Sequence, residues 1–284
     1  MIRDNEWGVS IERMCALFKI SRSAYYDWQK RVPKSGSELE IKIKAIFHKS
    51  KSSYGSPRIV SELGDQKIKS SRSTVARIMK KLNLVAKPKK RFVLTTNSNH
   101  DNPISENLLN RQFSADRLNH KWVSDITYIA TKQGWCYLTA ILDLADRMVV
   151  SWHLSNTLNA EQTIITTMNK ALQKNSIKQE LIFHSDRGNQ YSCLVFRELL
   201  GKNKYIKQSM SRKANCWDNA VAESFFKTIK TECIKNQIFE NIYEAKKQIF
   251  DYIERWYNTH RKHSSINFMS PLQKNQLLSN RLEA

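Results

Sequence analysis

Residues 121–154, KWVSDITYIATKQGWCYLTAILDLADRMVVSWHL, contain three runs that are rich in β-branched and aromatic side chains. Side chains of these kinds favour β-strands, and the joints TKQG and DR between the runs are typical of turns. Strands joined by segments this short fold back on one another. The stretch therefore predicts an antiparallel meander of three strands.

The residues after the meander alternate between helical and strand patterns. NAEQTIITTMNKALQKN (159–175) and SCLVFRELLG (192–201) are predicted to be helices, and Ile164, Ile165, Met168 and Leu172 form the apolar stripe of the first. LIFHSD (181–186) is predicted to be a short buried strand, and IKQS (206–209) a fifth, minor strand. This order predicts an α/β fold, a mixed five-stranded sheet with helices packed on its faces.

Two aspartates occupy unusual places in this predicted sheet. Asp125 lies in the middle of the first strand, and Asp186 lies at the tip of the strand that follows the first helix. Burying carboxylates is costly unless cations or hydrogen bonds compensate. If the two strands are neighbours, the acids converge, and a divalent cation would relieve their repulsion. A turn cap or an ion-pair partner are the other roles open to Asp186.

A third acid is expected from the later helix in NCWDNAVAESFFKTIKTE (215–232), which offers Asp218, Glu223 and Glu232. Either Asp218 or Asn219 is predicted to be the helix N-cap. Glu223, Lys227 and Lys230 follow one another at one-turn spacing on a face beside the apolar one, which suits a metal site next to phosphates. Taken alone, this pattern also fits a solvated, salt-bridged face.

The first part of the chain is basic and predicted to be helical. Residues 1–32 and 38–95 each contain two short helices with a tight turn, and such pairs indicate helix-turn-helix units. In the second unit Ser73 is predicted to cap the second helix. The exposed start of that helix and its end would then contact DNA, through Arg72, Thr74, Arg77, Lys80 and Lys81. An ordinary helical hairpin with a solvated basic face is the alternative.

The chain's composition points to a polyanionic partner. The 284 residues include 47 Lys and Arg against 26 Asp and Glu, which gives a formal net charge of +21. This excess indicates nucleic acid as the partner, and KPKKR (87–91) adds a further phosphate-seeking patch. No apolar run is long enough to span a bilayer, and MIRDNEWGVS has no features of a secretory signal. The five scattered cysteines are expected to be reduced thiols of a cytoplasmic protein.

Residues 96–112, rich in Asn and Ser, are predicted to be a linker ahead of a catalytic region at 113–284. Four ordered motifs there, WVSDITYI, HSDRGNQY, MSRKANCWDNAVAESFFKTIKTE and YNTHRKHSSINFMSPLQ, resemble the integrase-like transposases of the Asp-Asp-Glu class. More closely, the chain is similar to the second reading-frame product of the insertion-sequence-three family. The 36 residues between Asp186 and Glu223 are one more than is usual there, and the extra residue fits the loop GKNKY.

The resemblance implies a ribonuclease-H-like core with Asp125, Asp186 and Glu223 as its acidic triad. It implies two Mg²⁺ ions, replaceable by Mn²⁺, that serve cleavage of element ends and strand transfer. Arg187 would allow a phosphate backbone to approach closely, and Lys227 and Lys230 would bind phosphates near the cut.

The partners implied are the DNA of the element ends and of the target, further copies of the chain on that DNA, and an upstream reading-frame product, separate or joined by frameshifting. The protein is expected in the bacterial cytoplasm, associated with the nucleoid. A non-catalytic helix-turn-helix regulator would explain the charge but leave the three acids without a role. A metal-dependent nuclease on the same fold is the other alternative.

Overall fold

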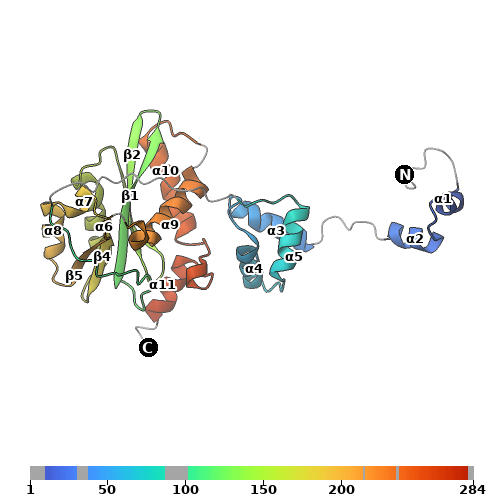
Figure 1. The fold of residues 1–284 in the computed structure, drawn as a ribbon, viewed down its shortest axis with the longest axis horizontal. Helices are drawn as coiled ribbons and strands as arrows, with labels where there is room; N and C mark the ends of the chain where they lie inside the picture. The colour runs from blue at the N-terminus through green and yellow to red at the C-terminus, as the bar shows by residue number, and fades with distance from the viewer. Residues whose placement is uncertain (1–9, 31–37, 87–101, 214, 235–236, 281–284) are drawn as a thin grey trace. The chain divides into compact units, whose positions relative to one another are not determined.

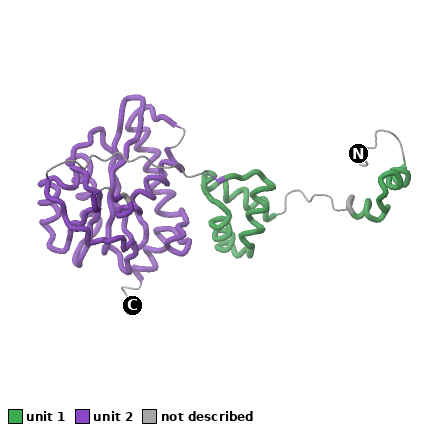
Figure 2. The backbone as a smooth tube through the Cα atoms, viewed as in Figure 1, with its two compact units in different colours: residues 1–85 green, residues 86–284 purple. Residues whose placement is uncertain are grey.

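The computed structural model describes residues 10–30, 38–86, 102–213, 215–234 and 237–280. The chain divides into two compact units, residues 1–85 and residues 86–284 (Figure 2). The basic patch at 87–91 lies outside the described residues. None of the described helices combines the length and the apolar character needed to cross a bilayer.

The second unit is built on one five-stranded sheet (Figure 1). Its strands are β1 Lys121–Thr131, β2 Gly134–Asp143, β3 Val149–Ser155, β4 Leu181–Ser185 and β5 Ile206–Met210. The spatial order is β3-β2-β1-β4-β5, with an antiparallel β1-β2-β3 meander and with β4 parallel to both β1 and β5. At the β1–β2 turn Gly134 has a φ of 120°, a conformation that a side chain would strain. The predicted mixed α/β sheet is confirmed.

Helices cover both faces of this sheet (Figure 1). One face packs against η1 Glu161–Ile165, α6 Thr166–Lys174, α7 Asn189–Ser192 and α8 Leu194–Gly201. The other face packs against α9 Ala220–Ile229 and α10 Ile242–Tyr252. α9 contacts the sheet through the apolar side chains predicted for it, Ala222, Phe225, Phe226 and Ile229. The remaining helical segments are η2 Cys216–Asn219, η3 Lys230–Ile234, η4 Ile253–Tyr257, η5 Ser264–Ile266 and α11 Pro271–Asn280.

The second half of the predicted linker belongs to this unit. Leu109 is fully buried in the core formed with α9 and α10. The backbone N–H groups of Leu108 and Leu109 donate to the Ser209 hydroxyl of β5, at 2.9 and 3.2 Å. Residues 102–112 are thus part of the second unit, because Leu109 and these backbone donors find partners on it.

The first unit contains α1 Ile11–Leu17, α2 Arg22–Lys30, α3 Glu38–Lys49, α4 Ser56–Asp65 and α5 Arg72–Lys81. Buried side chains of α3, α4 and α5 include Ile43, Ile59 and Val75, each with no exposed surface. Ser71, rather than the predicted Ser73, caps α5, because its hydroxyl accepts from the backbone N–H of Thr74 at 3.1 Å. Arg72 therefore already lies inside the helix.

A buried ion pair connects η3 to the chain before η5. The Arg261 guanidinium, 2% exposed, donates from Nη2 to Glu232 Oε1 at 2.7 Å and from Nε to Oε2 at 2.9 Å. The Tyr252 hydroxyl donates to the same carboxylate at 2.8 Å. Glu232 is therefore not the third acid of the site but a buried carboxylate, 7% exposed, held by Arg261 and Tyr252.

Replacing Arg261 with Met should destabilise the protein by about 3–5 kcal/mol, because the Glu232 carboxylate would stay buried without its cation. Urea unfolding measures the change. Arg255→Met is the matched control, since Arg255 pairs with Asp251 on an exposed helix surface and such pairs contribute about 1 kcal/mol or less. Similar losses from both variants would contradict a structural role for the buried pair.

Candidate active site

The pairing of β1 with β4 brings two acids together. The strands run parallel, with Val123 opposite His184 in the last ladder position. Two residues further along each chain are Asp125 and Asp186, and neighbouring strands lie about 4.8 Å apart. Asp186 directly follows the end of β4 at Ser185. The sequence prediction that these acids converge is therefore met by the topology.

The environment of Asp125 disfavours its charged form. Asp125 is half-buried, and its Oδ1 accepts from the backbone N–H of Ile126 at 2.7 Å. Burial raises the pKa of Asp125 well above its usual value, and the negative charges of Asp186 and Glu223 raise that pKa further. A positive charge placed among these acids would reverse the effect.

Asp186 is held by the turn that leads into α7. Its Oδ1 accepts from the backbone N–H of Gly188 at 2.9 Å. The next residue, Arg187, was expected to face a phosphate backbone, but its Nε donates to the Ser211 carbonyl at 2.6 Å. Arg187 therefore ties this turn to the segment after β5, and its side chain supports the position of Asp186.

Glu223 enters the site from the first turn of α9. It is half-buried, and burial followed by the charge of Asp186 raises the pKa of its carboxyl group. Two lysines follow on the same helix face. Burial lowers the pKa of Lys230, while the charge of Asp125 opposes that change. Lys227, one turn after Glu223, is also half-buried. The three acids and Lys230 thus lie within electrostatic reach of one another.

Asp218 anchors the loop ahead of α9. It is fully buried, and its carboxylate accepts from Arg212 Nη2 at 2.8 Å, from Arg111 Nε at 2.8 Å and from the Asn107 amide at 2.9 Å. Hydrogen bonding to Arg212 is the main reason that the pKa of Asp218 lies well below its usual range. The predicted N-cap role is wrong, because the arginines take the carboxylate that would have capped the helix.

Asn219 connects the start of α9 to the strand that carries Asp125. Its amide Nδ2 donates to the Ser124 carbonyl at 3.0 Å, and the Ser124 hydroxyl shares a 2.9 Å hydrogen bond with the buried Tyr191 hydroxyl of α7. The Asn219 amide oxygen is buried and has no hydrogen-bond partner among the described residues. Asn219 was the other N-cap candidate, and it occupies that position without a side-chain cap hydrogen bond; its link to Ser124 was not predicted.

The three carboxylates suit a divalent cation in their chemistry. Oxygen donors are the ligands that Mg²⁺ and Mn²⁺ prefer, and the raised pKa values of Asp125 and Glu223 show uncompensated negative charge. Among the described residues, no three acidic, His or Cys side chains are close enough to form a metal cluster as they stand.

Five residues of α5 were expected to contact DNA, and the structure separates them. Arg72, Arg77 and Lys80 are exposed. The Thr74 hydroxyl instead hydrogen-bonds to the Ser71 hydroxyl at 2.9 Å, and Lys81 Nζ pairs with Glu40 at 2.7 Å. Lys81 is exposed as well, so Arg72, Arg77, Lys80 and Lys81 all present basic side chains to solvent, while the Thr74 hydroxyl helps to close the start of α5.

Comparison with known proteins agrees with this architecture. An integrase core domain model matches residues 115–216, a second integrase core domain model matches residues 204–271, and an HTH-like domain model matches residues 36–92.

Among solved structures, a chain of the simian T-cell lymphotropic virus intasome in complex with the PP2A regulatory subunit B56 gamma aligns with a TM-score of 0.48 and 14% identity, over 83% of this chain and 74% of that one. The catalytic domain of the Mos1 mariner transposase aligns with a TM-score of 0.41 and 17% identity, over 58% and 79%. The HTLV-2 integrase catalytic core in complex with magnesium aligns with a TM-score of 0.40 and 16% identity, over 56% and 97%.

Two bacterial relatives are much closer in sequence. A 31 kDa protein of the insertion element IS600 from Shigella sonnei is 39% identical over 91% of this chain and 96% of its own length. The transposase InsF of insertion sequence IS3A from Escherichia coli K12 is 36% identical over 96% of both chains. The chain therefore belongs to the IS3 family of insertion-sequence transposases, DDE-type polynucleotidyl transferases with an integrase core and an HTH-like domain.

Proposed function

We propose that Asp125, Asp186 and Glu223 are the catalytic carboxylates of this transposase and that they hold two Mg²⁺ ions, for which Mn²⁺ can substitute. The observation that carries the proposal is the parallel pairing of β1 with β4, which sets Asp125 beside Asp186. The charge of Asp186 raises the pKa of both Asp125 and Glu223, so all three acids are near one another. Bound there, such ions would activate an attacking oxygen and stabilise the leaving oxygen of an in-line displacement.

The protein's own side chains have positioning roles in this reaction. Asn219 and Asp218 fix the start of α9, so that Glu223 faces the two aspartates. No side chain needs to bond covalently to DNA. Attack by water at the element end frees a 3′-hydroxyl, and that hydroxyl then attacks a phosphodiester of the target DNA. Lys227 and Lys230 bind the phosphates that flank the reacting one.

We assign sequence recognition and general DNA affinity to the helix-turn-helix region within residues 38–95, through the exposed side chains of Arg72, Arg77 and Lys80. The chain acts as an oligomer on the element ends, together with the product of an upstream reading frame or fused to it by frameshifting. Its place of action is the bacterial cytoplasm, at the nucleoid where its DNA lies.

The variants Asp125→Asn, Asp186→Asn and Glu223→Gln should each abolish DNA cleavage, because each loses one charged metal-binding oxygen. Their unfolding free energy in EDTA should fall by no more than about 1 kcal/mol, since the change also removes repulsion. Labelled element-end DNA with Mg²⁺ or Mn²⁺ measures cleavage, and strand-transfer products distinguish a transposase from a nuclease. Glu198→Gln, on the exposed surface of α8, should remain active. Robust cutting by any triad variant would refute the assignment.

Replacing Lys227 and Lys230 together with Gln should weaken binding of element ends and slow their cleavage, while the helix propensity stays similar. The control replaces Lys178 and Lys202, which are exposed and lie ahead of β4 and β5, at the opposite end of these strands from Asp186. Both variants lose two positive charges. Equal losses in cleavage would mean that bulk charge, and not placement beside Glu223, explains the effect.

The double variant Arg77→Gln/Lys80→Gln should lower the salt dependence of DNA binding. Each phosphate contact contributes about 0.9 to the slope of log affinity against log salt concentration, so the slope should fall by roughly 1–2. Lys44→Gln/Lys51→Gln, also exposed in the same unit, should leave the slope unchanged. A slope that stays the same in the α5 variant would show that this helix does not contact DNA.

A further inference from the structure

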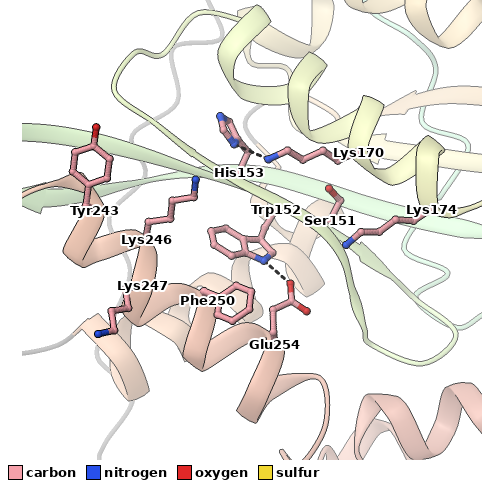
Figure 3. Close-up of a pocket in the computed structure, with 10 residues that line it drawn as sticks. All are labelled: Ser151, Trp152, His153, Lys170, Lys174, Tyr243, Lys246, Lys247, Phe250 and Glu254. Atoms are coloured by element: carbon pink, nitrogen blue, oxygen red, sulfur yellow. Dashed lines mark hydrogen bonds between the residues drawn. The ribbon is translucent and has the colours of Figure 1, made fainter.

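A groove with a volume of about 440 Å³ lies at the outer edge of the sheet, and none of the three acids lines it (Figure 3). β3 is the last strand in the sheet order and supplies its floor through Trp152. α6 supplies Lys170 and Lys174, and α10 supplies Tyr243, Lys246 and Lys247 (Figure 3). Nothing in the family's integrase core match gives this groove a role.

The groove concentrates positive charge. Its single lining acid is Glu254, whose Oε1 accepts from the Trp152 indole N–H at 2.8 Å. None of the four lysines forms an ion pair within the described part of the chain. Burial, followed by the charges of Lys246 and Lys174, lowers the pKa of Lys170. Lysines that repel one another in this way bind an anion favourably, because the anion relieves their repulsion.

The histidine of the groove does not add to this charge at neutral pH. Lys170 Nζ lies 3.0 Å from His153 Nδ1. Burial, and then the charges of Lys170 and Lys246, lower the pKa of His153 to about 4. The imidazole is thus neutral near pH 7 and can accept a hydrogen bond from the Lys170 ammonium group. His153 orients a lysine, while the lysines supply the charge.

Aromatic side chains accompany the lysines. Tyr243 is 79% exposed and Phe250 is 45% exposed, both on α10 (Figure 3). Large aromatic side chains exposed to water between cations are the combination by which proteins bind the bases or sugars of nucleic acids together with their phosphates. A small acidic ligand would bind the lysines but would leave the rings of Tyr243 and Phe250 exposed to water.

The floor of the groove also lies two strands across the sheet from Asp125. Asp125 pairs with Ala140 of β2, and Ala140 pairs with Trp152 of β3. Residues paired across strands point to the same face, and two strand spacings amount to about 10 Å. A DNA molecule at Asp125 is wide enough to reach a site this close, since the major groove alone is about 12 Å across.

We propose that this groove is a second DNA-binding site of the catalytic unit. Its lysines, Lys170, Lys174, Lys246 and Lys247, bind the phosphodiester backbone beside the cut, and Tyr243 packs against a sugar or base. The assignment rests on DNA as the substrate of the proposed function. A second copy of the chain fits less well, because a symmetric interface would bring the same lysines of both copies face to face.

The test is DNA binding by the full chain without divalent cations, so that cleavage plays no part in it. The variant Lys246→Gln/Lys247→Gln changes two exposed lysines, and Lys178→Gln/Lys202→Gln is the control of equal charge. The groove variant should lower the slope of log affinity against log salt concentration by about 1–2, at 0.9 per phosphate, and the control should not. Tyr243→Ala should weaken binding several-fold without changing the slope.

Light scattering of the same variants without DNA measures their association. An unchanged slope in the groove variant, or equal changes in groove variant and control, would overturn the proposal. An unchanged slope together with a lower molecular mass would identify the groove as an interface between copies instead. A lowered slope in the groove variant, together with full loss of cleavage in the triad variants, would support both the groove and the acidic triad. Triad variants that still cut DNA would refute only the proposed function.

Discussion

Parallel pairing of β1 with β4 is the constraint on which the rest of the site depends. It sets Asp125 beside Asp186, two residues beyond the Val123–His184 pair. Burial raises the pKa of Asp125, and the negative charges of Asp186 and Glu223 raise it further. Removing a carboxylate from water and placing it beside a second carboxylate both disfavour its charged form.

The third acid depends on a different set of contacts. Glu223 is on a helix, and a helix can slide or rotate unless its start is fixed. Asp218 fixes it through Arg212 and Arg111, and Asn219 does so through the Ser124 carbonyl next to Asp125.

Positive charge in the catalytic unit has two distinct uses. Some cations stabilise the fold, as Arg261 does for Glu232 and Arg212 for Asp218. Others remain without acidic partners among the described residues, as in the groove beside β3. A net charge of +21 cannot distinguish the two uses. Burial and hydrogen-bond geometry do, since a cation already paired inside the core has no capacity left for phosphate.

The sequence alone determined the strands and helices of the second unit, and it singled out the acids proposed for the site. Strand-forming runs with short joints specify the meander, and helical spacing specifies the apolar face of α9 that contacts the sheet. Both follow from local periodicity, which a single chain displays openly. The convergence of Asp125 and Asp186 required only that two strands be neighbours.

Only the tertiary structure decided which polar side chains already have a hydrogen-bond or ion-pair partner. The arginine partners of Asp218, the buried ion pair of Glu232, the pairing of Lys81 with Glu40 and the hydrogen bond from Arg187 to the Ser211 carbonyl were not predicted from the sequence. These contacts join residues from 6 to 107 positions apart along the chain. Local patterns show that a side chain is charged, but its partner depends on which surfaces the packed sheet and helices bring together.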